Sequence, residues 1–254
     1  GQQIYAVDPS RDALVVINAD DLSERQLLRN GDDGVVGLDG AAGVAVSPDG
    51  AFVYVVSPGS QTLLVFARDA ATGNLANPVT AAQDGSFSAF DTIAIDDSGA
   101  RVYTAGPQFL FAYDAVGGFV GFNIDNFSEV YQTSSLAVSH DGALVFAASA
   151  DRDMLWVLDR DLNLLQTIAG ADVALQGPSA ISVSADDGFV YVTGAGSNAV
   201  AVFARAGNSL DPVKTYVNGT DGVRGLLGAS DVVLTAGQRF VLVSGADNNA
   251  VAVF

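Results

Sequence analysis

The 254-residue sequence contains no cysteine, a single histidine and a single methionine. Without cysteine the chain forms no disulfide and offers no thiolate ligand to a metal. One histidine excludes a zinc site built from several imidazoles, and it leaves little basis for a Ser-His-Asp triad. The sequence therefore predicts no catalytic residues and no cofactor, apart from the calcium considered below.

Basic residues are also scarce, since 11 Lys and Arg face 29 Asp and Glu, a net charge of −18. Nucleic acids and anionic membrane surfaces attract proteins through basic patches, so neither is expected as a partner. No apolar run approaches the roughly 20 residues that cross a membrane as a helix. Membrane insertion is therefore not expected.

What the sequence does contain is one recurring pattern, seen most clearly in three short apolar runs near residue 50. The runs are Gly43–Ser47, Phe52–Ser57 and Thr62–Arg68, here named A, B and C. They are rich in β-branched and aromatic residues, and turn residues such as Pro48, Asp49 and Gly50 separate them. This pattern is typical of consecutive antiparallel strands.

The pattern recurs along the whole chain, with a weaker fourth run, D, before each new A run. The B runs share a large residue, at Tyr5, Tyr54, Tyr103, Phe146, Tyr191 and Leu242. The C runs share another, at Ile17, Phe66, Tyr113, Leu158, Phe203 and Phe254. A period in the forties with four strands per period predicts an all-β fold, a β-propeller of four-stranded antiparallel blades.

Six B–C hairpins predict six blades in one domain spanning residues 1–254. The copies are expected at about 1–38, 39–88, 89–131, 132–176, 177–227 and 228–254. The first copy starts at a B run and the last stops at a C run, so both are expected to have three strands. Seven blades are the alternative if the chain is a section of a longer protein.

Acidic loops are the candidate metal ligands, because the B–C and D–A loops of a propeller lie on the same face. These loops contain Asp8, Asp12, Asp151, Asp153 and Asp247, and Asp32, Asp33, Asp39, Asp84, Asp91 and Asp221. Calcium prefers such oxygen ligands, and Asp32, Asp33, Asp39, Asp221 and Asp247 are the candidates for one Ca²⁺ site. No stretch has EF-hand spacing, and acidic loops that are simply solvated are the alternative.

The remaining reactive residue types are expected to have structural roles. His140 lies at the position of Pro48 in the template, so it is expected to be a turn residue. Ser47, Ser139 and Ser184 recur at the ends of A runs, which favours turn hydrogen bonds over nucleophilic catalysis. Trp156 lies inside a C run and is expected in the core.

The repeats resemble a known family. Val44–Gly50 with Phe52–Val56, and Val190-Tyr-Val-Thr193, resemble the YVTN-type propeller repeat, while Ala199–Arg205 is similar to lactonase-like propellers. The linkers Asp33–Leu38 and Asp221–Leu226 are similar to repeats of large bacterial surface and secreted proteins. This group includes gluconolactone hydrolases and surface-layer proteins, and its lactonase members usually have seven blades.

The regularity of the copies favours a non-enzymatic interaction or structural module, secreted or at the cell surface of a bacterium or archaeon. A protein partner or self-assembly through the incomplete terminal blades is the expected mode of interaction. The alternative, from the resemblance, is a sugar-lactone hydrolase with a divalent metal in the central channel. Function is expected where the copies differ, which includes the third copy at Pro107–Tyr113 and Gly117–Phe127.

Overall fold

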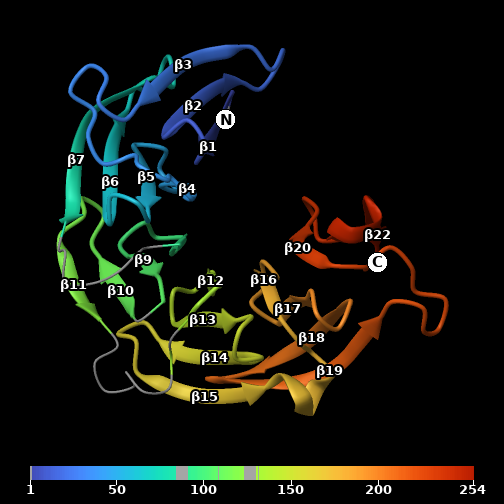
Figure 1. The fold of residues 1–254 in the computed structure, drawn as a ribbon. Coiled ribbons are helices and arrows are strands. Elements are labelled where there is room, and N and C mark those ends of the chain that lie inside the picture. The colour runs from blue at the N-terminus through green and yellow to red at the C-terminus, as the bar shows by residue number, and fades with distance from the viewer. Residues whose placement is uncertain (1, 84–90, 108, 123–129, 131) are drawn as a thin grey trace. The chain divides into compact units, whose positions relative to one another are not determined.

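The computed structural model describes residues 2–83, 91–107, 109–122, 130 and 132–254. These residues form six antiparallel sheets, four with four strands and two with three (Figure 1). The contacts divide the chain into two compact units, residues 1–122 and 123–254, and each is considered by itself. No helix in the described ranges is long and apolar enough to cross a membrane.

Unit 1 holds the first three sheets, named blades 1 to 3. Blade 1 is β1 (Gln3–Asp8), β2 (Ala13–Asn18) and β3 (Glu24–Arg29). Blade 2 is β4 (Gly43–Val46), β5 (Phe52–Ser57), β6 (Thr62–Arg68) and β7 (Leu75–Gln83). Blade 3 is β8 (Thr92–Ile95), β9 (Val102–Ala105), β10 (Leu110–Tyr113) and β11 (Phe119–Phe122).

Unit 2 holds blades 4 to 6. Blade 4 is β12 (Ser135–Val138), β13 (Leu144–Ser149), β14 (Met154–Asp159) and β15 (Leu164–Ala169), followed by a 3-10 turn at Gly170–Val173. Blade 5 is β16 (Pro178–Val183), β17 (Phe189–Gly194), β18 (Ala199–Ala206) and β19 (Ser209–Val217). Blade 6 is β20 (Ala229–Leu234), β21 (Val241–Gly245) and β22 (Ala250–Val253), with a 3-10 turn at Ala246–Asn248.

The A, B, C and D runs of the sequence are the successive strands of each blade. Blade 2 shows the rule, since β5 pairs with β4 on one side and β6 on the other, with Tyr54 opposite Ala45 and Val65. In the residues that the structure describes, blade 1 has no A strand and blade 6 has no D strand, as the sequence predicts. The prediction of an all-β, six-bladed propeller is confirmed.

The core lies between neighbouring blades, because each small sheet has apolar side chains on both faces. In unit 1, Tyr54 and Val65 of blade 2 pack in one cluster with Val102 and Tyr113 of blade 3. In unit 2, Phe146 of blade 4 packs in one cluster with residues of blade 5. A single blade would leave these faces exposed, so neighbouring blades stabilise each other.

In the third copy, the link between β9 and β10 has four positions, as in the other blades, so the short B–C link that the sequence indicated is wrong; the strands β9 and β10 are shorter instead, with four residues each. Its D strand, β11, pairs with β10 with an irregular register near Tyr113. Residues 123–127, which belong to the irregular part of this copy, lie outside the described residues. Asp84, one of the acidic loop residues, lies outside them too.

Glutamine side chains join the outer strands of neighbouring blades. The amide of Gln26 on β3 accepts a hydrogen bond from Leu75 N at 2.8 Å and donates one to Leu75 O at 2.9 Å, at the start of β7. Gln166 on β15 makes the same pair of bonds to Leu210 on β19, at 2.7 and 3.0 Å. In each pair, the glutamine side chain holds the start of an outer strand against the outer strand of the preceding blade.

Candidate functional site

The serines at the ends of the A strands are occupied by turn hydrogen bonds. Ser47 Oγ donates to Asp49 Oδ1 at 2.6 Å and accepts from Phe52 N at 2.9 Å. Ser139 and Ser184 make the same two bonds in blades 4 and 5. Their role is to close the A–B turn, in agreement with the sequence expectation.

His140 lies in such a turn, and the contacts around it are ion pairs and backbone bonds. His140 N donates to Asp187 Oδ1 at 2.7 Å, and Arg205 reaches Asp141 Oδ2 at 2.8 Å and Asp187 Oδ2 at 3.5 Å. Burial opposes ionisation of Asp141, but hydrogen bonds from Arg205 and Ser139 outweigh it and lower its pKa to about 2. The cluster joins the A–B turns of blades 4 and 5.

Trp156, the one tryptophan of the sequence, is 1% exposed and lies in the core, as the sequence predicts.

In blades 1, 4 and 5, the last residue of the B–C turn fastens the blade to the loop that follows it. Asp12 Oδ1 accepts from Gly40 N at 2.9 Å, and Asp153 Oδ1 accepts from Gly177 N at 2.6 Å. In blade 5 the equivalent residue is an asparagine, and its Oδ1 accepts from Gly228 N at 2.7 Å. A neutral amide oxygen makes the same hydrogen bond in blade 5. The carboxylates of Asp12 and Asp153 therefore act as acceptors for backbone N–H groups, and this bond does not require their charge.

The five calcium candidates occupy loop turns in both units. Asp33 and Asp221 have the positive φ values of 49° and 52°, and Asp32 O accepts from Val35 N at 2.8 Å. Asp39 N donates to Ser60 Oγ at 3.0 Å, and Asp247 N donates to Leu227 O at 3.1 Å. Among the described residues, no group of three or more His, Cys, Asp or Glu side chains is placed to hold a metal ion. The calcium site therefore stays a prediction.

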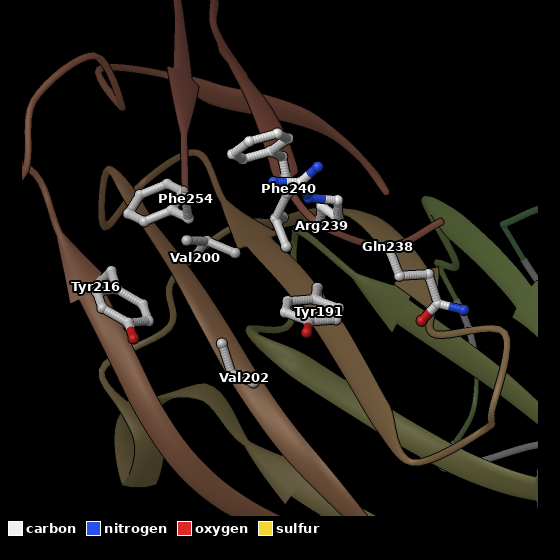
Figure 2. Close-up of a pocket in the computed structure, with 9 residues that line it drawn as sticks. Tyr191, Val200, Val202, Tyr216, Gln238, Arg239, Phe240 and Phe254 are labelled. Atoms are coloured by element: carbon white, nitrogen blue, oxygen red, sulfur yellow. The ribbon is translucent and has the colours of Figure 1, made fainter. Parts of the chain in front are cut away.

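A pocket of about 290 Å³ lies in unit 2, between the face of blade 5 and the A–B turn of blade 6 (Figure 2). Blade 5 supplies Tyr191, Val200, Val202 and Tyr216, and blade 6 supplies Gln238, Arg239, Phe240, Val241 and Phe254. The rings of Tyr216 and Phe254 are 5.2 Å apart, and Lys214 Nζ lies 4.7 Å from the centre of the Tyr216 ring. Four of the nine lining residues are thus aromatic and three are valines, and the cationic groups of Arg239 and Lys214 lie beside them.

Within the described part of the chain, the Tyr191 hydroxyl makes no hydrogen bond, although it borders this pocket. Burial, together with the charge of Asp186 and the nearby Tyr216, raises the pKa of the hydroxyl. At neutral pH the group is therefore protonated and can donate to an acceptor in the pocket.

The pocket adjoins β22, whose only partner among the described strands is β21. Val241 and Phe254 exchange both of their backbone hydrogen bonds, at 2.9 and 3.0 Å. Because such pairs alternate along an antiparallel ladder, the backbone groups of Val251 and Val253 point to the other edge. Val251 and Val253 are 63% and 59% exposed. In blade 5 the matching Val200 is 2% exposed, because its side chain packs in one cluster with Val232 and Val243 of blade 6.

Comparison with known proteins places the chain in a family. Residues 7–108 and 120–224 match the model described as lactonase, 7-bladed beta-propeller. The chain belongs to this lactonase family. Its six described sheets contrast with the seven blades in the family's description. No curated protein matches the sequence.

Solved structures similar to this lactonase-family chain have different names. A proposed 6-phosphogluconolactonase from Bacteroides uniformis ATCC 8492 is 18% identical, with a TM-score of 0.68, over 95% of this chain and 73% of that one. A functionally unknown protein from Desulfotomaculum acetoxidans DSM 771 is 17% identical, with a TM-score of 0.57, over 100% and 92%. Hydrazine synthase from Kuenenia stuttgartiensis is 15% identical, with a TM-score of 0.72, over 100% and 80%. At these identities the likeness concerns the fold.

Sequence reasoning missed the pocket and the blade-to-blade bonds of this lactonase-family chain. Asp12 and Asp153 were grouped with the acidic loops, whereas both bind backbone N–H groups. Asn198 at the equivalent position was the available signal, since calcium binding would favour a carboxylate there. The pocket has no comparable signal, because its walls come from strands of two blades.

Proposed function

We propose that this propeller is a non-enzymatic module that binds an extended segment of a partner protein by strand addition to β22. The observation that carries the proposal is the edge of β22, which pairs with β21 alone among the described strands and directs the backbone groups of Val251 and Val253 away from β21. Strand addition satisfies such backbone groups with hydrogen bonds and covers the side chains with alternating residues. We place the module outside the cell or at its surface, and cell fractionation would test that location.

The identity of neighbouring sequences supports a strand as the occupant. Ala199–Phe203 and Ala250–Phe254 are both Ala-Val-Ala-Val-Phe, and in blade 5 this sequence is covered by β19. A segment with the chemistry of β19 would therefore find the same side chains on β22. A second folded copy of the chain is a poorer donor, because its described D strands are all paired within their own blades.

The proposal is tested with a fluorescein-labelled peptide of sequence Ser209–Val217 and a scrambled peptide of the same composition. We expect saturable binding of the first peptide alone, measured by fluorescence anisotropy. Val251→Pro should abolish it, because proline removes an outward N–H and places its ring at the docking edge. Equal binding of both peptides, or unchanged binding to Val251→Pro, would contradict strand addition.

Sugar-lactone hydrolysis is the second candidate function, and membership of the lactonase family supports it. Its test is the turnover of gluconolactone by the purified chain, with a divalent metal and with excess chelator. Metal-dependent hydrolysis well above the spontaneous rate would replace the interaction proposal as the primary function. Strand addition predicts that the rate stays at the spontaneous level in both conditions.

A further inference from the structure

We infer that Asn218 is a site of spontaneous deamidation in the folded protein, and that Asn30, in a loop of the same sequence pattern, is protected from this modification. Only these two asparagines of the sequence precede a glycine. They begin two loops, Asn30–Ala41 and Asn218–Ala229, here named loop 1 and loop 2, which share the pattern Asn-Gly-x-Asp-Gly-Val-x-Gly-Leu-x-Gly-Ala. The inference does not depend on the proposed binding of a partner.

The reaction joins the backbone nitrogen of the glycine to the side chain of the asparagine before it. Gly219 N loses its proton and bonds to Cγ of Asn218, while the side-chain nitrogen takes up a proton and leaves as ammonia, which gives a five-membered succinimide. Water then opens the ring at one of its two carbonyl carbons and leaves aspartate or isoaspartate at position 218. A following glycine favours the ring closure, because it has no Cβ atom to hinder it.

In loop 2 the reacting groups lie near solvent and are held by hydrogen bonds. Gly219 is exposed and Asn218 is partly exposed. Gly219 N donates to Val223 O at 2.8 Å, and Asn218 Oδ1 accepts from Leu226 N at 3.1 Å. The attacking nitrogen must give up the proton that it shares with Val223 O, so the reaction proceeds when the loop opens locally and breaks these bonds.

Loop 1 has both of these hydrogen bonds in the same places. Gly31 N donates to Val35 O at 2.7 Å, and Asn30 Oδ1 accepts from Leu38 N at 3.2 Å. The two loops therefore have the same closed conformation at the reacting groups. A difference in their rates of deamidation must come from how often each loop opens.

Loop 1 is held by two additional hydrogen bonds. Asn30 Oδ1 accepts a second bond from Gly37 N at 2.9 Å, and Thr62 Oγ1 donates to Gly37 O at 2.6 Å. Thr62 is 1% exposed at the start of β6, so the second bond ties the loop to the interior of blade 2. Both bonds must break before loop 1 opens.

In loop 2 the described residues supply neither of these additional bonds. Asn218 Oδ1 accepts one hydrogen bond from them, whereas its counterpart in loop 1 accepts two. The place of Thr62 is taken by Ala250, which has no hydroxyl group. A Cβ atom built on Gly225 would lie 3.6 Å from Ala250 Cβ, and one built on Gly37 would lie 3.1 Å from Thr62 Oγ1. Loop 2 should therefore open more often than loop 1.

Deamidation would alter the connection between blades 5 and 6. Both products add one negative charge to loop 2. In isoaspartate the main chain passes through the side-chain methylene group, so it is one atom longer before Gly219. Asn218 N donates to Asn198 O at 2.9 Å, and the longer chain shifts the turn closed by Gly219 N relative to this bond.

The test compares the two sites within the same chain. The purified protein is incubated at mildly alkaline pH, with and without a denaturing concentration of urea. Modified molecules are separated by anion-exchange chromatography, because they carry an additional negative charge, and peptide mapping by mass spectrometry locates the change. The rates in urea give the intrinsic reactivity of each Asn-Gly pair, and the rates in the folded protein are divided by them.

We expect the corrected rate at Asn218 to exceed that at Asn30 about 30-fold, or about fivefold for each of the two additional hydrogen bonds. Thr62→Val keeps the shape of the side chain and removes its hydroxyl, so it should accelerate the reaction at Asn30 about fivefold. The rate at Asn218 should not change in this variant, which also shows that the fold is kept.

Equal corrected rates at the two sites of the wild-type chain would overturn the inference. So would the absence of any reaction at Asn218 in the folded protein. A rate at Asn30 that is the same in Thr62→Val and in the wild type would contradict the role given to the additional hydrogen bonds.

Discussion

Blades 5 and 6 contain nearly the same hairpin in two different surroundings. Gly194–Phe203 and Gly245–Phe254 differ at only two positions, and both form a B–C hairpin that ends in Ala-Val-Ala-Val-Phe. In blade 5 a fourth strand, β19, covers the hairpin edge, and in blade 6 the described residues supply none. The exposure of the first valine of this run changes from 2% at Val200, which packs against blade 6, to 63% at Val251.

This difference shows that the hairpin forms without its outer strand, and that the burial of this valine depends on a neighbouring blade, since Val200 packs in one cluster with Val232 and Val243 of blade 6. The apolar alternation of β22 has the same composition as a covered strand, although two of its valines face solvent. Soluble proteins usually protect such edges with charges, prolines or bulges. The absence of these devices in Ala250–Val253 is consistent with an edge that binds another strand.

Proline substitution should give the largest difference in stability between the C strands of blades 5 and 6. Val200→Pro removes an N–H that bonds to β19 from inside a four-stranded sheet, so we expect the free energy of unfolding to fall by about 3 kcal/mol or more. Val251→Pro removes an N–H that points to solvent, and we expect a loss of less than about 1 kcal/mol. Urea unfolding of the two variants measures both values. Equal losses would show that the two edges are equally paired.

The asparagines at the ends of the two B–C turns provide the next test. Asn198→Ala leaves Gly228 N without its 2.7 Å acceptor, and we expect a loss of about 1–2 kcal/mol in unfolding free energy. Asn249, the equivalent residue of blade 6, has the same left-handed backbone but makes no side-chain hydrogen bond to any described residue, so Asn249→Ala should cost about 1 kcal/mol less than Asn198→Ala. Asp153→Asn should be nearly neutral, because the amide oxygen can still accept from Gly177. A large loss in Asp153→Asn would restore the case for a charge-dependent site.

The tyrosine hydroxyls should give a comparable difference. Tyr5→Phe removes a hydrogen bond to Gly73 O and the acceptor of one from Arg68 Nε, and we expect the free energy of unfolding to fall by about 1–2 kcal/mol. Tyr191→Phe removes a hydroxyl without a protein partner among the described residues and should leave stability unchanged. Thermal unfolding of the two variants, without peptide, provides the measurement. A comparable loss in Tyr191→Phe would show that its hydroxyl is already bound.

The smallest expected effect is a pH dependence of stability, which should be larger for the A–B turn of blade 4 than for that of blade 5. Arg205 helps to lower the pKa of Asp141 from 3.8 to about 2, so the carboxylate stabilises the fold above about pH 4, and this contribution is lost as the pH falls to about 2. Because the side chain is 47% exposed, solvent reduces the contribution to about 0.5–1 kcal/mol. Asp141→Asn should therefore lose less stability over this range than the wild type.

Asp186→Asn is the control for that experiment. Asp186 occupies the same turn position in blade 5, and its pKa is lowered by hydrogen bonds from Ser184 and Gly188 without an arginine. Its substitution should alter the acid dependence less than Asp141→Asn does. The same acid dependence in both variants would contradict a special role for Arg205.

The strand order was predictable from the sequence because the repeats keep the same residue types at each strand. Tyr54, Tyr103 and Tyr191 mark the B strands, and glycines mark the turns after the A strands, so six blades could be counted. The outer strands gave weaker signals, since β7 and β19 contain Pro78 and Pro212 and are largely solvent-facing. These prolines are tolerated because an outer strand has one free edge.

The candidate site was much less predictable, for two physical reasons. The role of Asp12 depends on a hydrogen bond to Gly40, 28 residues away, and a carboxylate in a loop looks the same whether it binds backbone or metal. The exposure of β22 depends on a missing neighbour, whereas its own sequence matches that of a buried strand. Side-chain identity could not distinguish either case.

Amide hydrogen exchange of the four valines in these two strands tests the central claim most directly. In the free chain, Val200 and Val202 amides should be protected, and Val251 and Val253 amides should exchange rapidly. With saturating Ser209–Val217 peptide, the amides of Val251 and Val253 should become protected while those of Val200 and Val202 do not change. Amides of Val251 and Val253 that still exchange rapidly in the saturated complex would contradict the account.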